Sequence, residues 1–306
     1  MVIATHGRAL YIMDDLRPLQ MQACSTPAQP FVVGPRVSYQ YNLHGNDEGI
    51  YTDYAGSNPD YGAIFWYYQP TPGTQAPVLQ ILDRGRVIRT VQGNREPSPF
   101  APAAADSKPK PKIPNGAGLQ SFTWGYAVDG PVKWNGAGKF FKGPDAGASV
   151  PPGTYGYRMT VDGKTFSGAF VVKADPATRF TQAEMVASYD FSNRMFDKLS
   201  QLDVALNSLD DVRAALTKKN DTVGLQHLQD IQDQLTANYQ GFEDFVQRSG
   251  KLREDLMSMA GAGLITPAVL DSERRMNAEW ATDAQAFNAY IQTLPADVPK
   301  PKPLPI

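Results

Sequence analysis

The feature that most constrains the fold is a run of apolar residues spaced by three or four positions in the second half of the chain. Between residues 181 and 294 the only proline is Pro267, and this spacing is that of one face of an α-helix. The stripe comprises Met195, Leu199, Leu202, Leu206, Leu209, Val212 and Leu216. Thr181 and Glu184 have the spacing of a capping box, which satisfies free N–H groups at a helix start. We therefore expect a long amphipathic helix that buries this stripe.

Further helices are expected after Asn220-Asp221-Thr222. Thr266 is a suitable N-cap, and Pro267 would take the first helical position, where its missing N–H costs nothing. The later apolar stripes are Leu225, Leu228, Ile231, Leu235, Tyr239, Phe242 and Val246, then Leu252, Leu256 and Met259, then Leu270, Trp280, Ala284, Phe287, Ile291 and Leu294. Three or four such helices joined by short turns predict an antiparallel helical bundle over residues 176–295.

The part before the helices has a different pattern, in which short strands alternate with turns. In residues 61–68, Ile64, Trp66 and Tyr68 alternate with Ala63, Phe65 and Tyr67. Turns at Asp83-Arg84-Gly85 and at Asp162-Gly163 predict hairpins within 76–91 and 150–172. With residues 118–124 as another strand, the pattern favours an immunoglobulin-like β-sandwich of about seven mostly antiparallel strands over 21–175.

Two segments lack an apolar period. Residues 94–118 are rich in proline, alanine and lysine, which predicts an exposed loop or disordered insertion between strands. The second segment is the tail, residues 296–306, which follows Pro295 and is rich in proline and lysine. We expect it to be extended and loosely held unless Leu304 and Ile306 dock on a neighbour.

Composition excludes several classes of function. The net charge is −2 and no run of five or six like charges occurs, so we expect no nucleic-acid or anionic-lipid partner. Cys24 is the only cysteine, which rules out an internal disulfide and any cysteine-based zinc site. No apolar run is long enough to span a bilayer, and residues 1–15 lack the features of a secretory signal.

Catalytic signatures are absent from the sequence. The three histidines, His6, His44 and His227, show no metal-ligand spacing, and no nucleophile elbow, phosphate loop or dinucleotide-binding motif occurs. We therefore predict no catalytic residue, no metal site and no cofactor. The chain's ligand-binding residues stay unassigned at this point.

Two weaker alternatives remain open. The acids Asp47, Glu48, Asp53 and Asp60 could offer oxygen ligands to calcium, although their spacing matches no calcium loop, and a polar surface loop explains them. The aromatic cluster at 61–68 could stack against a sugar, whereas a sandwich core also needs large rings. The members of this cluster are Tyr61, Phe65, Trp66, Tyr67 and Tyr68.

The first residues, VIATHGRALYIMDDLRPLQ (2–20), predict a hairpin in which Gly7 makes the turn and Leu10 and Ile12 share one strand face. This stretch resembles the closing segment of sortilin-like β-propellers in bacterial proteins catalogued as BNR or Asp-box glycosyl hydrolases. The matching residues are Thr5, His6, Gly7, Arg8, Asp14, Asp15, Pro18 and Leu19. NPDYGAIFWYY (58–68), PGTYGYRMTVDGKTF (152–166) and DPATRFTQAEM (175–185) also resemble that family, in the same order. The middle part is similar to the immunoglobulin-like domain of flagellar hook-capping proteins.

The resemblance implies that residues 1–20 are the remnant of a last propeller blade and its exit segment. The resemblance also implies an exported protein. Because the sequence shows no secretory signal, the compartment stays open. The family's Asp-box does not occur. Where relatives carry Gly-x-Asn-x-Phe followed by Trp-Asp, this chain has Gln120 and Trp124-Gly125, so the aspartate is absent. Because a propeller site needs several blades, we expect a non-catalytic accessory or interaction region that packs against a propeller or binds another protein chain. The alternative is a carbohydrate-binding or glycoside-hydrolase-related protein that uses the aromatic cluster at 61–68.

Overall fold

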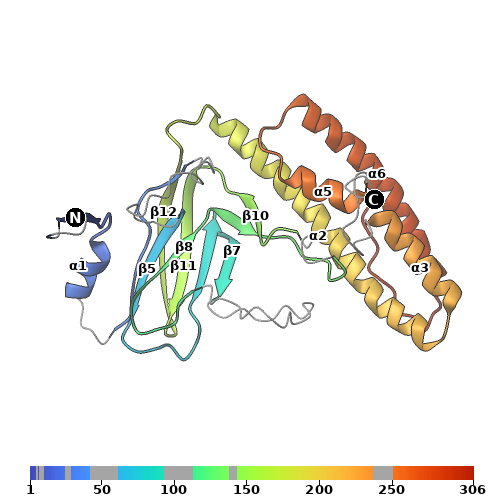
Figure 1. The fold of residues 1–306 in the computed structure, drawn as a ribbon, viewed down its shortest axis with the longest axis horizontal. Helices are drawn as coiled ribbons and strands as arrows, with labels where there is room; N and C mark the ends of the chain where they lie inside the picture. The colour runs from blue at the N-terminus through green and yellow to red at the C-terminus, as the bar shows by residue number, and fades with distance from the viewer. Residues whose placement is uncertain are drawn as a thin grey trace. The chain divides into compact units, whose positions relative to one another are not determined.

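The computed structural model describes residues 1–4, 6, 10–24, 29–41, 61–92, 113–137, 143–236 and 251–306 (Figure 1). The chain divides into two compact units. One, called the β unit here, comprises Met1–Glu96, Ala105–Ala127 and Pro151–Arg179. The other, the helical unit, comprises Pro97–Ala104, Val128–Val150 and Phe180–Ile306. Mostly β structure is therefore followed by helices, and the described residues form no barrel or propeller.

The β unit contains a five-stranded and a three-stranded sheet. The first has the order β4-β12-β11-β6-β7, with β4 at Ser38–Gln40, β6 at Val78–Asp83, β7 at Arg86–Gln92, β11 at Gly153–Val161 and β12 at Lys164–Ala174. The second has the order β3-β5-β8, with β3 at Phe31–Val33, β5 at Ala63–Gln69 and β8 at Gly118–Trp124. The strand predicted at 61–68 is thus confirmed as the central strand of its sheet.

Both predicted hairpins form at the predicted turns. Arg84 and Gly85 join β6 to β7 with φ of 48° and 84°, and Asp162 and Gly163 join β11 to β12 with φ of 48° and 73°. Two consecutive positive φ angles match the right-handed twist of the strands, and glycine adopts them without a steric penalty. One pairing departs from the antiparallel prediction, because β12 pairs with β4 in parallel, Val172 opposite Ser38.

Aromatic rings fill the space between the two sheets. The Phe65 ring of β5 makes edge contacts with Tyr157 of β11 and Phe170 of β12, at centroid distances of 5.3 and 5.6 Å. Trp124 of β8 contacts Phe170 at 5.9 Å. The two sheets therefore pack face to face, and edge-to-face ring geometry adds to the stabilisation from burial.

A short hairpin and one helix precede these sheets. Strands β1 (Val2–Ala4) and β2 (Leu10–Ile12) pair only with each other, and helix α1 covers Arg17–Cys24. The predicted turn residue Gly7 lies outside the described residues, as do His44, the four acids of the calcium alternative, and residues 94–112 of the predicted insertion.

The helical unit contains α2 (Gln182–Lys218), α3 (Thr222–Leu235), α5 (Leu252–Ala260) and α6 (Pro267–Thr293). The capping box is confirmed: the Glu184 N–H donates to the Thr181 hydroxyl, and the Thr181 N–H donates to the Glu184 carboxylate. Thr266 is likewise the N-cap of α6, with Pro267 in its first position. All seven residues of the predicted α2 stripe are buried.

One irregular segment packs with the helices although the sequence places it in the β region. Strands β9 (Ala127–Asp129) and β10 (Ala146–Ser149) form a two-stranded sheet, and residues 130–137 lie between them in sequence. Trp134 and Ala137 belong to the same buried cluster as the helix stripes. The helical unit thus includes part of the range 21–175 for which the sequence predicts a sandwich.

Candidate functional site

Of the three histidines, the structure describes His6 and His227, and it does not bring these two together. His6 is exposed, and His227 on α3 is exposed with its ring against the edge of Tyr290 of α6, 4.9 Å between centroids. Among the residues that the structure describes, no group of three or more His, Cys, Asp or Glu side chains could hold a metal ion. Within the same residues, no helix has both the length and the apolar character needed to cross a bilayer.

The acids of the opening segment have a structural role. The Asp15 carboxylate accepts hydrogen bonds from the Arg17 side chain, at 2.9 Å from Nε and 2.6 Å from Nη2, and these bonds lower the pKa of Asp15. Arg17 also donates to the carbonyl of Gly34, and Arg36 donates to the carbonyl of Asp14. Charge-assisted bonds of this kind are strong, so they attach the exit segment to the residues around β3.

The aromatic cluster at 61–68 is divided between two faces of β5. Phe65 and Tyr67 are fully buried between the sheets, and burial raises the pKa of Tyr67. Trp66 and Tyr68 are half-buried on the opposite face, where Tyr68 stacks on Phe31 at 5.4 Å between centroids. Tyr61 is exposed and lies edge-on to Tyr126. Only Tyr61, Trp66 and Tyr68 are therefore accessible to a ligand such as a sugar.

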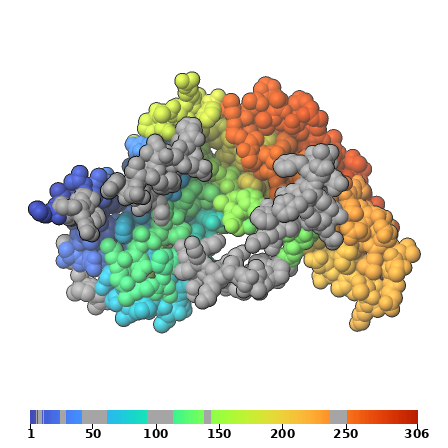
Figure 2. Space-filling model, in the orientation of Figure 1, coloured from blue at the N-terminus to red at the C-terminus, as the bar shows by residue number. Residues whose placement is uncertain are grey.

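The N-terminal hairpin exposes apolar residues on one face. Val2 pairs with Ile12 and Ala4 pairs with Leu10, so these four side chains lie on the same side of the two-stranded sheet. The exposed fractions of Val2, Leu10 and Ile12 are 63%, 66% and 69%. Figure 2 shows these first residues in dark blue at the surface of the molecule. We call this set of four residues the hairpin face.

A buried ion pair holds the segment 132–135 against α2. Arg253 of α5 donates two hydrogen bonds to Asp203, at 2.6 and 2.9 Å, and both side chains are fully buried. Asp203 also accepts the Trp134 N–H at 3.0 Å. Burial raises the pKa of Asp203, against the opposing effect of the bonds from Arg253. A buried charge is tolerated only when it is paired and hydrogen-bonded in this way.

Neighbouring polar residues of α2 extend this attachment. The Asn207 side chain accepts the Asn135 N–H at 2.8 Å and donates to the Lys133 carbonyl at 2.9 Å. Ser200 accepts the Val132 N–H at 3.2 Å. Ser200, Asp203 and Asn207 are spaced by three and four residues, so they line one face of the helix. We call these three residues the α2 clamp. The sequence offers one signal for it, since Asp203 and Asn207 directly follow the stripe residues Leu202 and Leu206.

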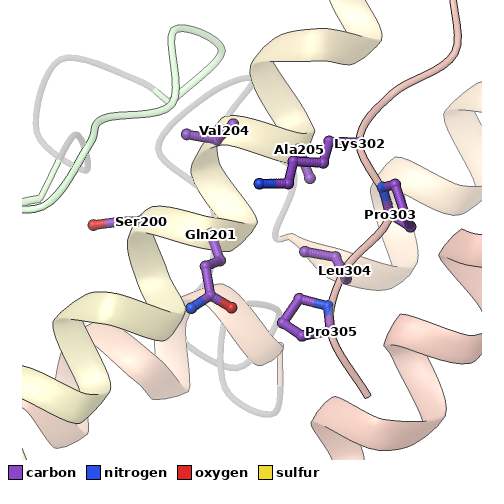
Figure 3. A pocket seen from close by; sticks show the side chains of 8 residues that line it. All are labelled: Ser200, Gln201, Val204, Ala205, Lys302, Pro303, Leu304 and Pro305. Carbon is purple, nitrogen blue, oxygen red and sulfur yellow. The ribbon is translucent and has the colours of Figure 1, made fainter.

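A groove on the helical unit receives the end of the chain. It has a volume of about 560 Å³ and lies between Ser200, Gln201, Val204 and Ala205 of α2 and residues 302–305 (Figure 3). Leu304 is buried, with 4% exposed, whereas Ile306 is 76% exposed. Of the two residues that the sequence offers as docking groups, Leu304 therefore docks and Ile306 does not.

No protein-family model, curated protein or solved structure matches this chain. The resemblance to the sortilin-like propeller proteins therefore stays a prediction from the sequence motifs. The structure offers three candidate binding surfaces: the hairpin face, the accessible rings of β5 and the groove on the helical unit.

Proposed function

We propose that this chain is a non-catalytic interaction region, and that the hairpin face is its contact with a β-rich partner. The partner that the sequence motifs suggest is the propeller of a larger exported sortilin-like protein, to which residues 1–20 would contribute strands. We further infer that the five-stranded and three-stranded sheets form an immunoglobulin-like sandwich. The ring contacts between β5, β8, β11 and β12 support that inference.

The observation that carries the proposal is the exposure of the hairpin face. Isolated two-stranded hairpins are marginally stable in water, and the apolar side chains that would normally be buried are exposed here on one face. Apolar burial contributes roughly 25 cal/mol per Å², so covering Val2, Leu10 and Ile12 would stabilise a complex substantially. The open strand edges of the hairpin add unpaired backbone groups, which another strand could satisfy.

A first experiment tests the connection to a propeller. The reading frame upstream of Met1 is sequenced, and an in-frame region that encodes propeller blades supports the proposal. The blades are then produced as a separate chain and titrated calorimetrically with this protein. A stop codon directly upstream, or the absence of heat on mixing, would contradict the propeller as partner.

A matched pair of variants tests the face itself. Leu10→Lys with Ile12→Lys should weaken binding to the blades at least about tenfold, because two apolar contacts become charged. The control Arg86→Ala changes an exposed residue on β7 and should leave binding unchanged. Both variants should melt at the wild-type temperature, because all three side chains are exposed.

The alternative, carbohydrate binding, is favoured by one observation. Trp66 and Tyr68 are half-buried on the same face of β5, and Tyr61 is exposed near the start of this strand. Titration with a panel of glycans, monitored by tryptophan fluorescence, tests this alternative. Saturable quenching that disappears in Trp66→Ala and persists in Phe180→Ala would favour a sugar site over the interaction region.

A further inference from the structure

Residues 298–306 contact the helical unit with a period of three. Val298, Pro301 and Leu304 are buried, and the other six residues are exposed. Three residues per turn is the period of the polyproline II helix, which the prolines of this segment favour. One edge of such a helix is therefore seated on the bundle, while Lys300 and Lys302 on the other sides are exposed. We call this segment the C-terminal segment.

Side chains of α6 hold the backbone of this segment. Asn288 accepts the Leu304 N–H at 2.9 Å through Oδ1 and donates to the Leu304 carbonyl at 2.8 Å through Nδ2. The Trp280 Nε1–H donates to the Pro305 carbonyl at 2.8 Å. A polyproline II helix makes no internal hydrogen bonds, so its carbonyl groups are available to such donors. These three bonds recognise an extended main chain, and the Leu304 side chain supplies an apolar anchor.

Trp280 is itself held in position by α2. Lys198 Nζ lies 4.4 Å from the centre of the Trp280 ring, a distance at which an ammonium group and an aromatic face attract each other. Burial lowers the pKa of Lys198, while Glu273 acts in the opposite direction. Lys198 thus holds the Trp280 ring independently of the C-terminal segment, and such preorganisation favours binding.

The groove offers more room than the C-terminal segment fills. Figure 3 shows Lys302 and Leu304 extending toward α2, with Gln201 and Ala205 on the opposite wall. The open volume of about 560 Å³ lies within the range of small-ligand sites. Val204, one of its lining residues, is exposed. Open space beside the seated segment gives an incoming chain a place to make first contact.

The β unit buries the aliphatic-proline pair Ile113-Pro114 in a similar manner. PKPKIP (109–114) resembles PKPKPLP (299–305), since both alternate proline and lysine and end in a branched aliphatic residue followed by proline. Ile113 is fully buried, and Leu304 is only 4% exposed. The Tyr67 hydroxyl donates to the Pro114 carbonyl, as Trp280 donates to that of Pro305. In both places, therefore, an aliphatic side chain is buried and an aromatic side chain donates a hydrogen bond to the carbonyl of the proline that follows it.

From these contacts we propose that the groove beside α2, together with Trp280 and Asn288 of α6, is a binding site for extended, proline-rich peptides that carry an aliphatic residue followed by proline. The C-terminal segment is its built-in occupant, and an external peptide of this chemistry displaces it. Lys300 is exposed and does not line the groove, so a lysine at that position is not required, whereas Lys302 lines the groove beside Leu304. A tethered occupant competes at an effective concentration in the millimolar range, so the wild-type chain should bind the peptide weakly.

The test uses the full chain with one substitution, Leu304→Asp. A carboxylate placed in an apolar site is strongly unfavourable, so the C-terminal segment of this variant should detach and leave the groove open. A fluorescein-labelled peptide with the sequence of residues 298–306 is titrated by fluorescence polarisation. The variant should bind it at least about tenfold more tightly than the wild type, since the fraction of open groove sets the apparent affinity.

Matched controls separate groove binding from adhesion. The same peptide with aspartate in place of leucine should not bind. In the Leu304→Asp background, Trp280→Phe removes one donor but keeps a ring, and it should weaken peptide binding about fivefold or more. Gln292→Ala, an exposed change on α6, should have no effect. Circular dichroism melting confirms that each variant is folded.

A second measurement needs no variant. Millimolar peptide added to the wild-type chain should move the Leu304 methyl signals to their positions in the free peptide. The proposal is overturned if folded Leu304→Asp protein binds both peptides equally, or if the methyl signals of the wild type do not move. A third outcome is that the wild type forms concentration-dependent dimers and the Leu304→Asp variant does not. This result would overturn the proposal and assign the groove to the C-terminal segment of a second copy.

Discussion

The two terminal segments of this chain differ in how their backbone groups are hydrogen-bonded and in how far their apolar side chains are buried. Strands β1 and β2 form a hairpin with paired backbone groups, and yet the hairpin face is exposed. The C-terminal segment forms neither an α-helix nor a strand, and yet Leu304 is buried and both its N–H and its carbonyl are hydrogen-bonded to the Asn288 side chain. Secondary structure and burial are thus separate properties, and the second decides how strongly a segment is attached.

The segment 132–135 shares the second kind of attachment, and it should show the largest effect. Asp203→Ala removes the buried carboxylate that accepts two hydrogen bonds from Arg253 and one from the Trp134 N–H. Breaking a buried pair in this manner costs about 3–5 kcal/mol, which urea unfolding measures. Asp210→Ala, a change of an exposed residue on the same helix, is the matched control. Equal losses in the two variants would show that the ion pair does not hold this segment.

Leu304 and Leu10 compare the two terminal segments directly. Leu304→Ala removes a buried side chain and should lower the free energy of unfolding by about 2 kcal/mol or more. Leu10→Ala removes an exposed one and should change it by less than about 0.5 kcal/mol. Melting curves of the two variants measure both values. A larger effect of Leu10→Ala would mean that the hairpin face is covered in solution.

Asn288 tests the backbone recognition alone. Asn288→Ala removes both hydrogen bonds to Leu304 and should cost about 1–2 kcal/mol, the net contribution of two ordinary hydrogen bonds. Hydrogen exchange of the Leu304 amide should quicken, whereas the amides of β1 and β2 should exchange as before. If the Leu304 amide keeps its protection, packing rather than Asn288 holds the segment.

The smallest effect near neutral pH concerns buried tyrosines, which occur in both units. Burial raises the pKa of Tyr126 and of Tyr290 to about 12. Between pH 10 and pH 12 the unfolded chain releases these protons while the folded chain retains them, so stability falls as the pH rises through this window. Melting temperatures should be unaffected by these groups below about pH 9. Tyr290→Phe, which keeps the ring, should reduce the loss at high pH.

Regular patterns made much of the fold predictable. The α2 stripe and the capping box follow from the helical period and from local hydrogen bonding, and the turn at Asp162-Gly163 follows from the need for positive φ. Each of these signals is contained within a few consecutive residues. The parallel pairing of β4 with β12 joins residues far apart in sequence, and no local pattern encodes it.

The attached irregular segments were the harder part to predict. Residues 132–135 are held by side chains of the α2 clamp that bond to backbone atoms, so their own sequence carries no period. The C-terminal segment buries every third residue, a spacing that matches neither the strand period of two nor the helical period of 3.6. For the aromatic cluster at 61–68, the alternation of residues along the strand predicted two faces. Only the packing of the sheets shows which face is buried in the core and which is accessible.

The position of the α2 clamp has a consequence for sequence change over evolution. Ser200 both accepts the Val132 N–H and lines the groove for the C-terminal segment, so two separate attachments depend on the same turns of one helix. Inserting or deleting a single residue there would rotate everything beyond it by about 100°. The stretch from Ser200 to Asn207 should therefore accept substitutions far more readily than changes of length, and related chains should be recognised by a constant spacing here even where the residues themselves have diverged.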